Sequence, residues 1–147
     1  MKRVDLFKTL PEAYKTFLVL ENYVNSTELT PIHKELIKIR ASQLNGCAFC
    51  LDMHNRDACK LGETEQRLYT ISAWRDTPFF DEKEQAILAF VEEATLISKG
   101  GVSEATYAKA AEVLGEKYVA QVLVAIIAIN CWNRIAISTH MQPALQR

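Results

Sequence analysis

Two cysteines and a histidine stand close together near the middle of the chain, in a spacing that suits redox or metal chemistry. Cys47 and Cys50 form a C-x-x-C pair, and His54 follows Cys50 by four residues. Residues three and four apart on a helix share one face with Cβ atoms about 5–6 Å apart, so the three side chains can meet. Such thiols can alternate between a dithiol and a disulfide, while the histidine acts as a base or as a cation beside a thiolate.

The turn pair Asn45-Gly46 precedes Cys47 and places it at the very start of a helix. Unpaired N–H groups and the positive end of the helix dipole stabilise a thiolate there. The thiolate is the form of cysteine that attacks a peroxide or a disulfide. The position of the pair therefore favours a redox role.

A metal site and a purely structural role are the alternatives. Structural zinc sites take four ligands, and only Glu35 or Cys59 stands near enough to complete the set. Attachment of c-type haem needs a histidine directly after the second cysteine, where Leu51 stands. A thioredoxin-like site follows a strand, whereas both flanks here have helical periodicity. Spacing alone leaves Glu35, on the preceding helix, as a solvated charge.

The elements that carry these residues are all predicted to be helices, because apolar residues recur at steps of three and four. Thr30 and Pro31 begin one helix, and Asp81 with Glu84 has the spacing of a capping box. The expected helices cover residues 11–25, 31–45, 47–61, 64–75, 81–98, 103–114 and 116–138. The sequence therefore predicts an all-α fold.

The last predicted helix is apolar almost all round from Val119 to Ile129. This stretch is short for a bilayer span and is bounded or interrupted by Gln121 and Asn130. It is either the central helix of the monomer core or a helix partly covered by another subunit, and the two interpretations are compatible.

Composition sets the wider limits. The chain has 147 residues, of which 49% are apolar and 24% charged, and its formal net charge is −1. We therefore expect one domain over residues 1–147, with no electrostatic surface for nucleic acid and no membrane segment. The start of the chain lacks an uninterrupted apolar region, so we expect a cytoplasmic protein with reduced thiols.

The remaining cysteines, histidines and tryptophans receive structural assignments. We expect Cys59 and Cys131 to pack as small apolar residues within helices, and His33 and His140 to lie on the surface. The two tryptophans are expected to anchor the core or an interface. Phe49, Met53 and residues of the last helix are expected to line an apolar pocket beside Cys50.

The arrangement Glu35, Cys47-x-x-Cys50 and His54 resembles the signature of the AhpD-like alkylhydroperoxidases in the carboxymuconolactone decarboxylase superfamily. The resemblance extends over most of the chain, through the segments Glu35-Leu36-Ile37, Arg40-Ala41-Ser42, Asn45-Gly46, Cys47-Ala48-Phe49-Cys50, Met53-His54, Ser72-Ala73-Trp74-Arg75 and Ile129-Asn130-Cys131-Trp132-Asn133-Arg134.

This resemblance implies an AhpD-like fold of six to seven helices that assembles as a homo-oligomer, a trimer or a hexamer. It implies a thiol-dependent peroxidase that reduces alkyl hydroperoxides without a bound cofactor or metal, with electrons from an external dithiol or a reductant protein. Cys50 would be the peroxidatic thiol and Cys47 the resolving one, and Glu35 and His54 would relay protons.

One position departs from the family pattern. Better-studied relatives carry a histidine immediately before the second cysteine, where this chain has Phe49. Because a phenyl ring cannot transfer a proton, either the relay is shorter or the substrate or reductant differs.

Two alternatives to the peroxidase stay open: an enzyme of the carboxymuconolactone decarboxylase kind, and a redox-sensing or zinc-binding module without turnover. The lactone chemistry of the decarboxylases does not require a neighbouring cysteine pair.

Overall fold

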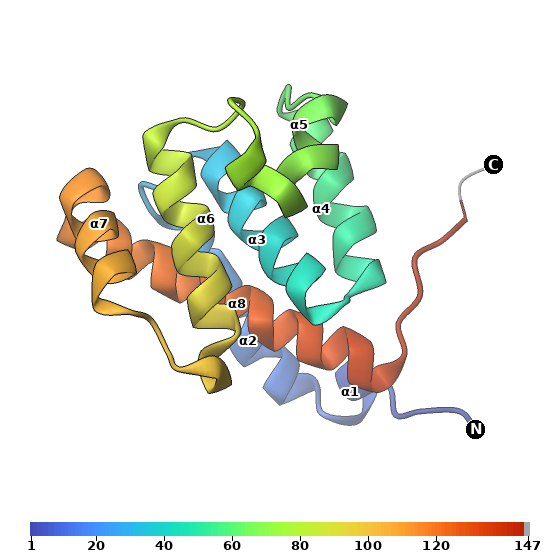
Figure 1. The fold of residues 1–147 in the computed structure, drawn as a ribbon. Helices are drawn as coiled ribbons and strands as arrows, with labels where there is room; N and C mark the ends of the chain where they lie inside the picture. The colour runs from blue at the N-terminus through green and yellow to red at the C-terminus, as the bar shows by residue number, and fades with distance from the viewer. Residues whose placement is uncertain (146–147) are drawn as a thin grey trace.

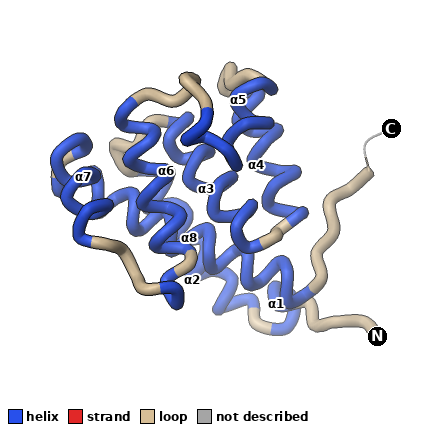
Figure 2. Tube along the Cα trace, viewed as in Figure 1, coloured by secondary structure: helices blue, strands red, loops and turns tan. Residues whose placement is uncertain are grey.

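The computed structural model describes residues 1–145. The regular structure of these residues consists of helices, and they contain no strand (Figure 2). The elements, in chain order, are α1 (Leu6–Thr9), α2 (Pro11–Ser26), α3 (Pro31–Asn45), α4 (Ala48–Lys60), α5 (Glu65–Thr70), the 3₁₀ helix η1 (Ile71–Asp76), α6 (Glu82–Thr95), the 3₁₀ helix η2 (Ile97–Lys99), α7 (Glu104–Leu114) and α8 (Glu116–Thr139). The predicted all-α fold is confirmed.

The helix ends follow the local signals in the sequence. The Thr30 hydroxyl accepts a hydrogen bond from the His33 amide at 3.1 Å, directly before Pro31. Asp81 and Glu84 form a reciprocal capping box at the start of α6. Gly46 adopts a left-handed conformation, with φ of 71°, where α3 ends. This turn reverses the chain and sets α4 against α3.

Two local predictions were wrong, and one short helix was missed. The segment 64–75 is not one helix: α5 passes into η1, where Ala73 leaves helical geometry. Helix α6 stops at Thr95, and η2 follows in place of its expected last turn. The short helix α1 was not expected at all, because a single turn leaves too little periodicity to detect.

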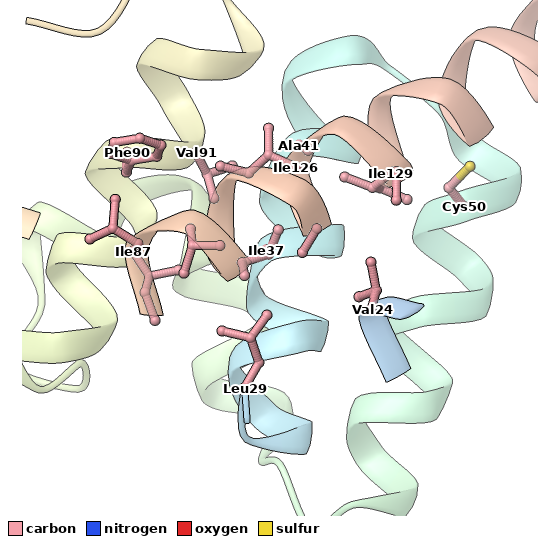
Figure 3. Close-up of a cluster of buried hydrophobic side chains, with 14 of the residues drawn as sticks. Val24, Leu29, Ile37, Ala41, Cys50, Ile87, Phe90, Val91, Ile126 and Ile129 are labelled. Atoms are coloured by element: carbon pink, nitrogen blue, oxygen red, sulfur yellow. The ribbon is translucent and has the colours of Figure 1, made fainter. Parts of the chain in front are cut away.

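Helix α3 lies at the centre of the fold and contacts α4, α6 and α8 (Figure 1). Ile37 faces one buried cluster with residues of α6 and α8, whereas Leu36 and Ile39 belong to a second cluster with α5, η1 and α6. Figure 3 shows the first cluster, with Cys50 at one end beyond Ile129. Since α3 is packed on two sides, it offers a rigid support for the side chains it carries.

Helix α8 is a core helix, as one of the two interpretations predicted. It runs along α2 and past α3 and α6 (Figure 1), and its buried residues include Val122, Ile126 and Ile129. By length and composition alone α8 could span a membrane, although 44% of its most apolar window is already buried inside this fold. Leu123 and Ile127 remain 40% and 48% exposed.

A network of amides ties α8 to the end of α3, just before the cysteines. The side-chain amide of Asn45 donates to the side-chain oxygens of Asn130 and Asn133, at 3.0 and 2.9 Å. The amide of Asn133 in turn donates to the Ser42 hydroxyl at 3.0 Å, where both residues are fully buried. Because buried polar groups are costly to leave unpaired, this network fixes the turn that leads into α4.

Candidate active site

Cys47 and Cys50 form a disulfide at the N-terminus of α4, with their Cα atoms 5.4 Å apart. Cys47 is the N-cap residue, and its sulfur accepts a hydrogen bond from the Cys50 amide at 3.4 Å. Each cysteine is only 1% exposed. The predicted pair is therefore close enough to alternate between thiol and disulfide forms, inside the protein and not on its outer surface.

His54 lies one turn beyond Cys50 and pairs with Glu35 of α3. His54 Nδ1 is 2.9 Å from a carboxylate oxygen of Glu35, and both side chains are buried. Spacing alone assigned Glu35 to the solvent, and that interpretation was wrong. The crossing of α3 and α4 turns its carboxylate inward, and the imidazole gives the buried charge a partner.

An ion pair lies one turn along α3 from Glu35. Lys38 Nζ is 2.6 Å from a carboxylate oxygen of Glu21 on α2, and the Lys38 side chain is only 8% exposed. The other carboxylate oxygen of Glu21 accepts a hydrogen bond from the Trp132 indole at 3.1 Å. Both oxygens of Glu21 are thus occupied, which holds the pair in one arrangement.

These groups border one cavity of about 510 Å³. Its polar lining consists of Glu21, Asn25, Glu35, Lys38, His54 and Asp57, and Cys50 opens onto it. Its apolar lining consists of Phe7, Tyr14, Leu18, Phe49, Met53, Trp132, Ile135, Ala136 and Met141. The expected apolar pocket beside Cys50, with Phe49, Met53 and residues of the last helix in its wall, is confirmed. A cavity of this size can hold a small organic molecule.

Aromatic rings from the N-terminal helices close one side of this cavity. The ring of Phe7 lies 4.2 Å from that of Tyr14, centroid to centroid, and both rings approach Trp132. Arg3 holds the N-terminal segment to the end of α8 by donating to the carbonyl oxygens of Ile137 and Ser138. These residues could not be assigned to the site from the sequence, because their contacts join the two ends of the chain and leave no local pattern.

Two of the structural assignments were wrong. His33 is buried, and its Nδ1 lies 2.6 Å from the hydroxyl of Tyr118. Burial lowers the pKa of His33, with the charges of Glu84 and Asp81 acting in the opposite direction. Cys59 is exposed, because its position on α4 faces away from the core.

The assignments of Cys131, His140 and the two tryptophans agree with the structure. Cys131 is half-buried and His140 is exposed. Trp74 belongs to the second buried cluster, and Trp132 forms part of the cavity wall. Within residues 1–145, no three His, Cys, Asp or Glu side chains are grouped so that they could hold a metal ion.

Comparison with known proteins agrees with the fold. The uncharacterized protein YdfG of Bacillus subtilis is 41% identical over 137 residues, which are 93% of either chain. A protein of unknown function from Agrobacterium tumefaciens, described as a candidate antioxidant defence protein AhpD, is 38% identical, with a TM-score of 0.95 over 99% of this chain and all of that one.

A more distant structure, the debrominase Bmp8, shares the fold with a TM-score of 0.84 at 17% identity, over 94% of this chain and 74% of that one. The sequence model of the carboxymuconolactone decarboxylase family matches residues 11–93. The chain therefore belongs to the carboxymuconolactone decarboxylase family and has the AhpD-like all-α fold.

Proposed function

We propose that this protein is a thiol-dependent peroxidase that reduces organic hydroperoxides through the Cys47–Cys50 pair. One observation carries the proposal: Cys50 opens onto the same cavity as the buried pair of His54 and Glu35, while its disulfide partner Cys47 is already in place. A nucleophile, a proton carrier and a resolving thiol are thus combined at one site.

In the first step the Cys50 thiol gives its proton to the His54–Glu35 pair, and the thiolate attacks the terminal oxygen of the hydroperoxide. The O–O bond breaks, and its electron pair leaves with the alkoxide. The alkoxide takes back the proton and departs as the alcohol, so Cys50 becomes a sulfenic acid. The sulfur is oxidised by two electrons and the peroxide is reduced by two.

In the second step the sulfur of Cys47 attacks the sulfenic sulfur of Cys50. Hydroxide leaves and takes the proton of the Cys47 thiol, which yields water and the disulfide. An external dithiol then returns the pair to its reduced form by exchange, and no bound cofactor is needed. The cytoplasm, which we propose as the location of the protein, keeps thiols reduced and so supplies such dithiols.

The cavity wall supports an organic substrate over hydrogen peroxide. Most of the lining is apolar or aromatic, and it includes Phe49, Met53 and Trp132. Transfer of an alkyl or aryl group from water into such surroundings is favourable by about 25 cal/mol for each Å² buried. Hydrogen peroxide has no apolar group to gain this contribution.

Trapping of the sulfenic acid tests the proposal and the order of the cysteines. A dimedone-type reagent is added with cumene hydroperoxide to the Cys47→Ser and Cys50→Ser variants, and the labelled peptide is identified by mass. We expect label on Cys50 in the first variant and none on Cys47 in the second. The exposed thiol of Cys59 is an internal control for unspecific oxidation. Label on Cys47 alone would reverse the assigned roles, and label on neither cysteine would refute the proposal.

A further inference from the structure

The two cysteines open onto different cavities. Cys50 lines the large cavity described above, and Cys47 does not. Cys47 instead lines a second cavity of about 120 Å³, which Cys50 does not reach. This small cavity lies between the first turn of α4 and the end of α8, and it is lined among others by Ala48, Ile137 and His140. The disulfide therefore connects two separate spaces.

The wall between the two cavities is made of three apolar residues. Phe49, Ala136 and Met141 line both spaces, and Phe49 stands in the chain between the two cysteines. Since a phenyl ring neither carries protons nor accepts hydrogen bonds as an imidazole does, this wall separates the surroundings of Cys47 from the Glu35–His54 pair.

We propose that the small cavity is the entrance for the reductant, and that the reductant attacks Cys47. Its volume is less than a quarter of that of the large cavity, which suits a narrow thiol. The occupant is therefore a small dithiol. This proposal rests on the proposed function in one respect only: in each cycle, reaction with the hydroperoxide must return the cysteine pair to its disulfide form.

The exchange balances in two steps. A thiolate of the reductant attacks the sulfur of Cys47, a bond forms between these two sulfurs, and the Cys47–Cys50 bond breaks with its electron pair leaving on Cys50. The second thiolate of the reductant then attacks the first reductant sulfur, which is bonded to Cys47 in the mixed disulfide. This bond breaks and releases Cys47 as a thiolate. The reductant becomes a disulfide, two electrons pass to the cysteine pair, and the protons lost from the two reductant thiols restore the thiols of the pair.

Attack at Cys47 also leaves the site ready for the next substrate. It releases the sulfur of Cys50 as a thiolate in the large cavity, beside His54 and Glu35. The reductant does not need to pass the alcohol product, because the two molecules use different cavities. Attack at Cys50 would require the reductant to enter the large cavity after the alcohol had left.

The two entrances can be separated by substitutions that fill one cavity at a time. Ala48 is exposed at the start of α4 and lines only the small cavity, whereas Leu18 of α2 is 37% exposed and lines only the large one. The proteins Ala48→Phe and Leu18→Phe are oxidised with diamide, and their reduction by dithiothreitol is followed by stopped flow. The oxidation of the reduced proteins by cumene hydroperoxide is measured in parallel.

We expect Ala48→Phe to slow reduction by about tenfold or more, and to slow oxidation by less than about twofold, because access to the attacked sulfur governs exchange. Leu18→Phe should slow oxidation by cumene hydroperoxide more than reduction. If Ala48→Phe slows both reactions alike, or neither, the separate entrance is refuted. Because diamide supplies the disulfide, failure of the hydroperoxide to react would refute the proposed function and leave this test intact.

A second measurement uses the unsubstituted protein and does not depend on how the variants fold. The diamide-oxidised protein is mixed with 2-mercaptoethanol and quenched within milliseconds with N-ethylmaleimide, and the peptides are mapped by mass. We expect the mixed disulfide on Cys47 and the maleimide on Cys50. The reverse distribution would overturn the proposal.

Discussion

Glu35 and Lys38 lie one turn apart on α3, and each is held by a different helix. Glu35 pairs with His54 of α4, and Lys38 pairs with Glu21 of α2. A buried ion pair and a buried carboxylate–imidazole pair at the wall of one cavity are costly in desolvation, so their presence points to a role for these groups in the cavity. In the proposed cycle, Glu35 keeps His54 oriented and able to accept and return a proton.

Glu35→Gln should therefore slow the oxidation of the pair by cumene hydroperoxide by about 10²-fold, a typical contribution of acid–base catalysis. Glutamine is nearly isosteric and can still accept a hydrogen bond from His54, so the fold should be retained. Glu28→Gln removes an equal charge from an exposed pair with Lys117 and is the matched control. If cumene hydroperoxide oxidises the unsubstituted protein, Glu35→Gln and Glu28→Gln at equal rates, Glu35 takes no part in the proton relay.

The site could be predicted from the sequence only where its members are neighbours in the chain. Cys47, Cys50 and His54 follow from the spacing of one helix. Glu35 required a family resemblance, because its contact depends on how two helices cross. The contact between Glu21 and Trp132 left no signal, since this hydrogen bond joins residues 111 positions apart in the chain.

At the scale of elements, the helix ends that carry strong local signals were predicted well. Thr30 with Pro31, the Asp81 capping box and Gly46 determine their ends by backbone chemistry alone. The segment 64–75 lacked such a signal. Its change from α to 3₁₀ geometry occurs where Ile71 and Trp74 reach the second buried cluster, so packing overrides local preference there.

His33 joins two elements, because its contact with Tyr118 connects the start of α3 with α8. Burial lowers the pKa of His33 from its ordinary value of 6.5, against the charges of Glu84 and Asp81. The folded protein thus favours the neutral ring, and the unfolded chain binds the proton first as the pH falls. The stability that this ring contributes is present above about pH 6.5 and is lost as the pH falls below it.

We therefore expect His33→Gln to lose less stability than the unsubstituted protein between pH 7.5 and pH 5.5, measured as the free energy of unfolding in urea. His140→Asn is the control, because His140 is exposed and asparagine tolerates its left-handed backbone. A pH dependence in His33→Gln as steep as that of the unsubstituted protein would contradict this role of His33.

At the scale of the whole molecule, the uncovered side of α8 is the main unexplained feature. Leu123 and Ile127 lie one turn apart and remain exposed, although the helix is otherwise part of the core. The all-α fold could be predicted because helical periodicity is local. Whether anything covers this side of α8 could not be predicted, because the periodicity of one chain carries no information about its contacts with other molecules.

We propose that a second copy of the chain covers this side of α8, in a homo-oligomer. Ile127→Glu should then lower the molar mass in solution towards the 16.6 kDa of one chain, since an unpaired charge in an interface is costly. Light scattering after size exclusion measures this change. Gln66→Glu adds the same charge to the exposed surface of α5 and should leave the mass unchanged. A monomeric unsubstituted protein would contradict the oligomer.

The most direct test of the peroxidase cycle is a count of thiols and an intact mass, before and after one equivalent of cumene hydroperoxide. The reduced protein should lose two thiols and about 2 Da as the disulfide forms, and Cys50→Ser should show neither change. Cys59 and Cys131 should remain countable in both proteins. Retention of all four thiols in the folded, unsubstituted protein, or an equal loss in Cys50→Ser, would contradict a redox cycle at this pair.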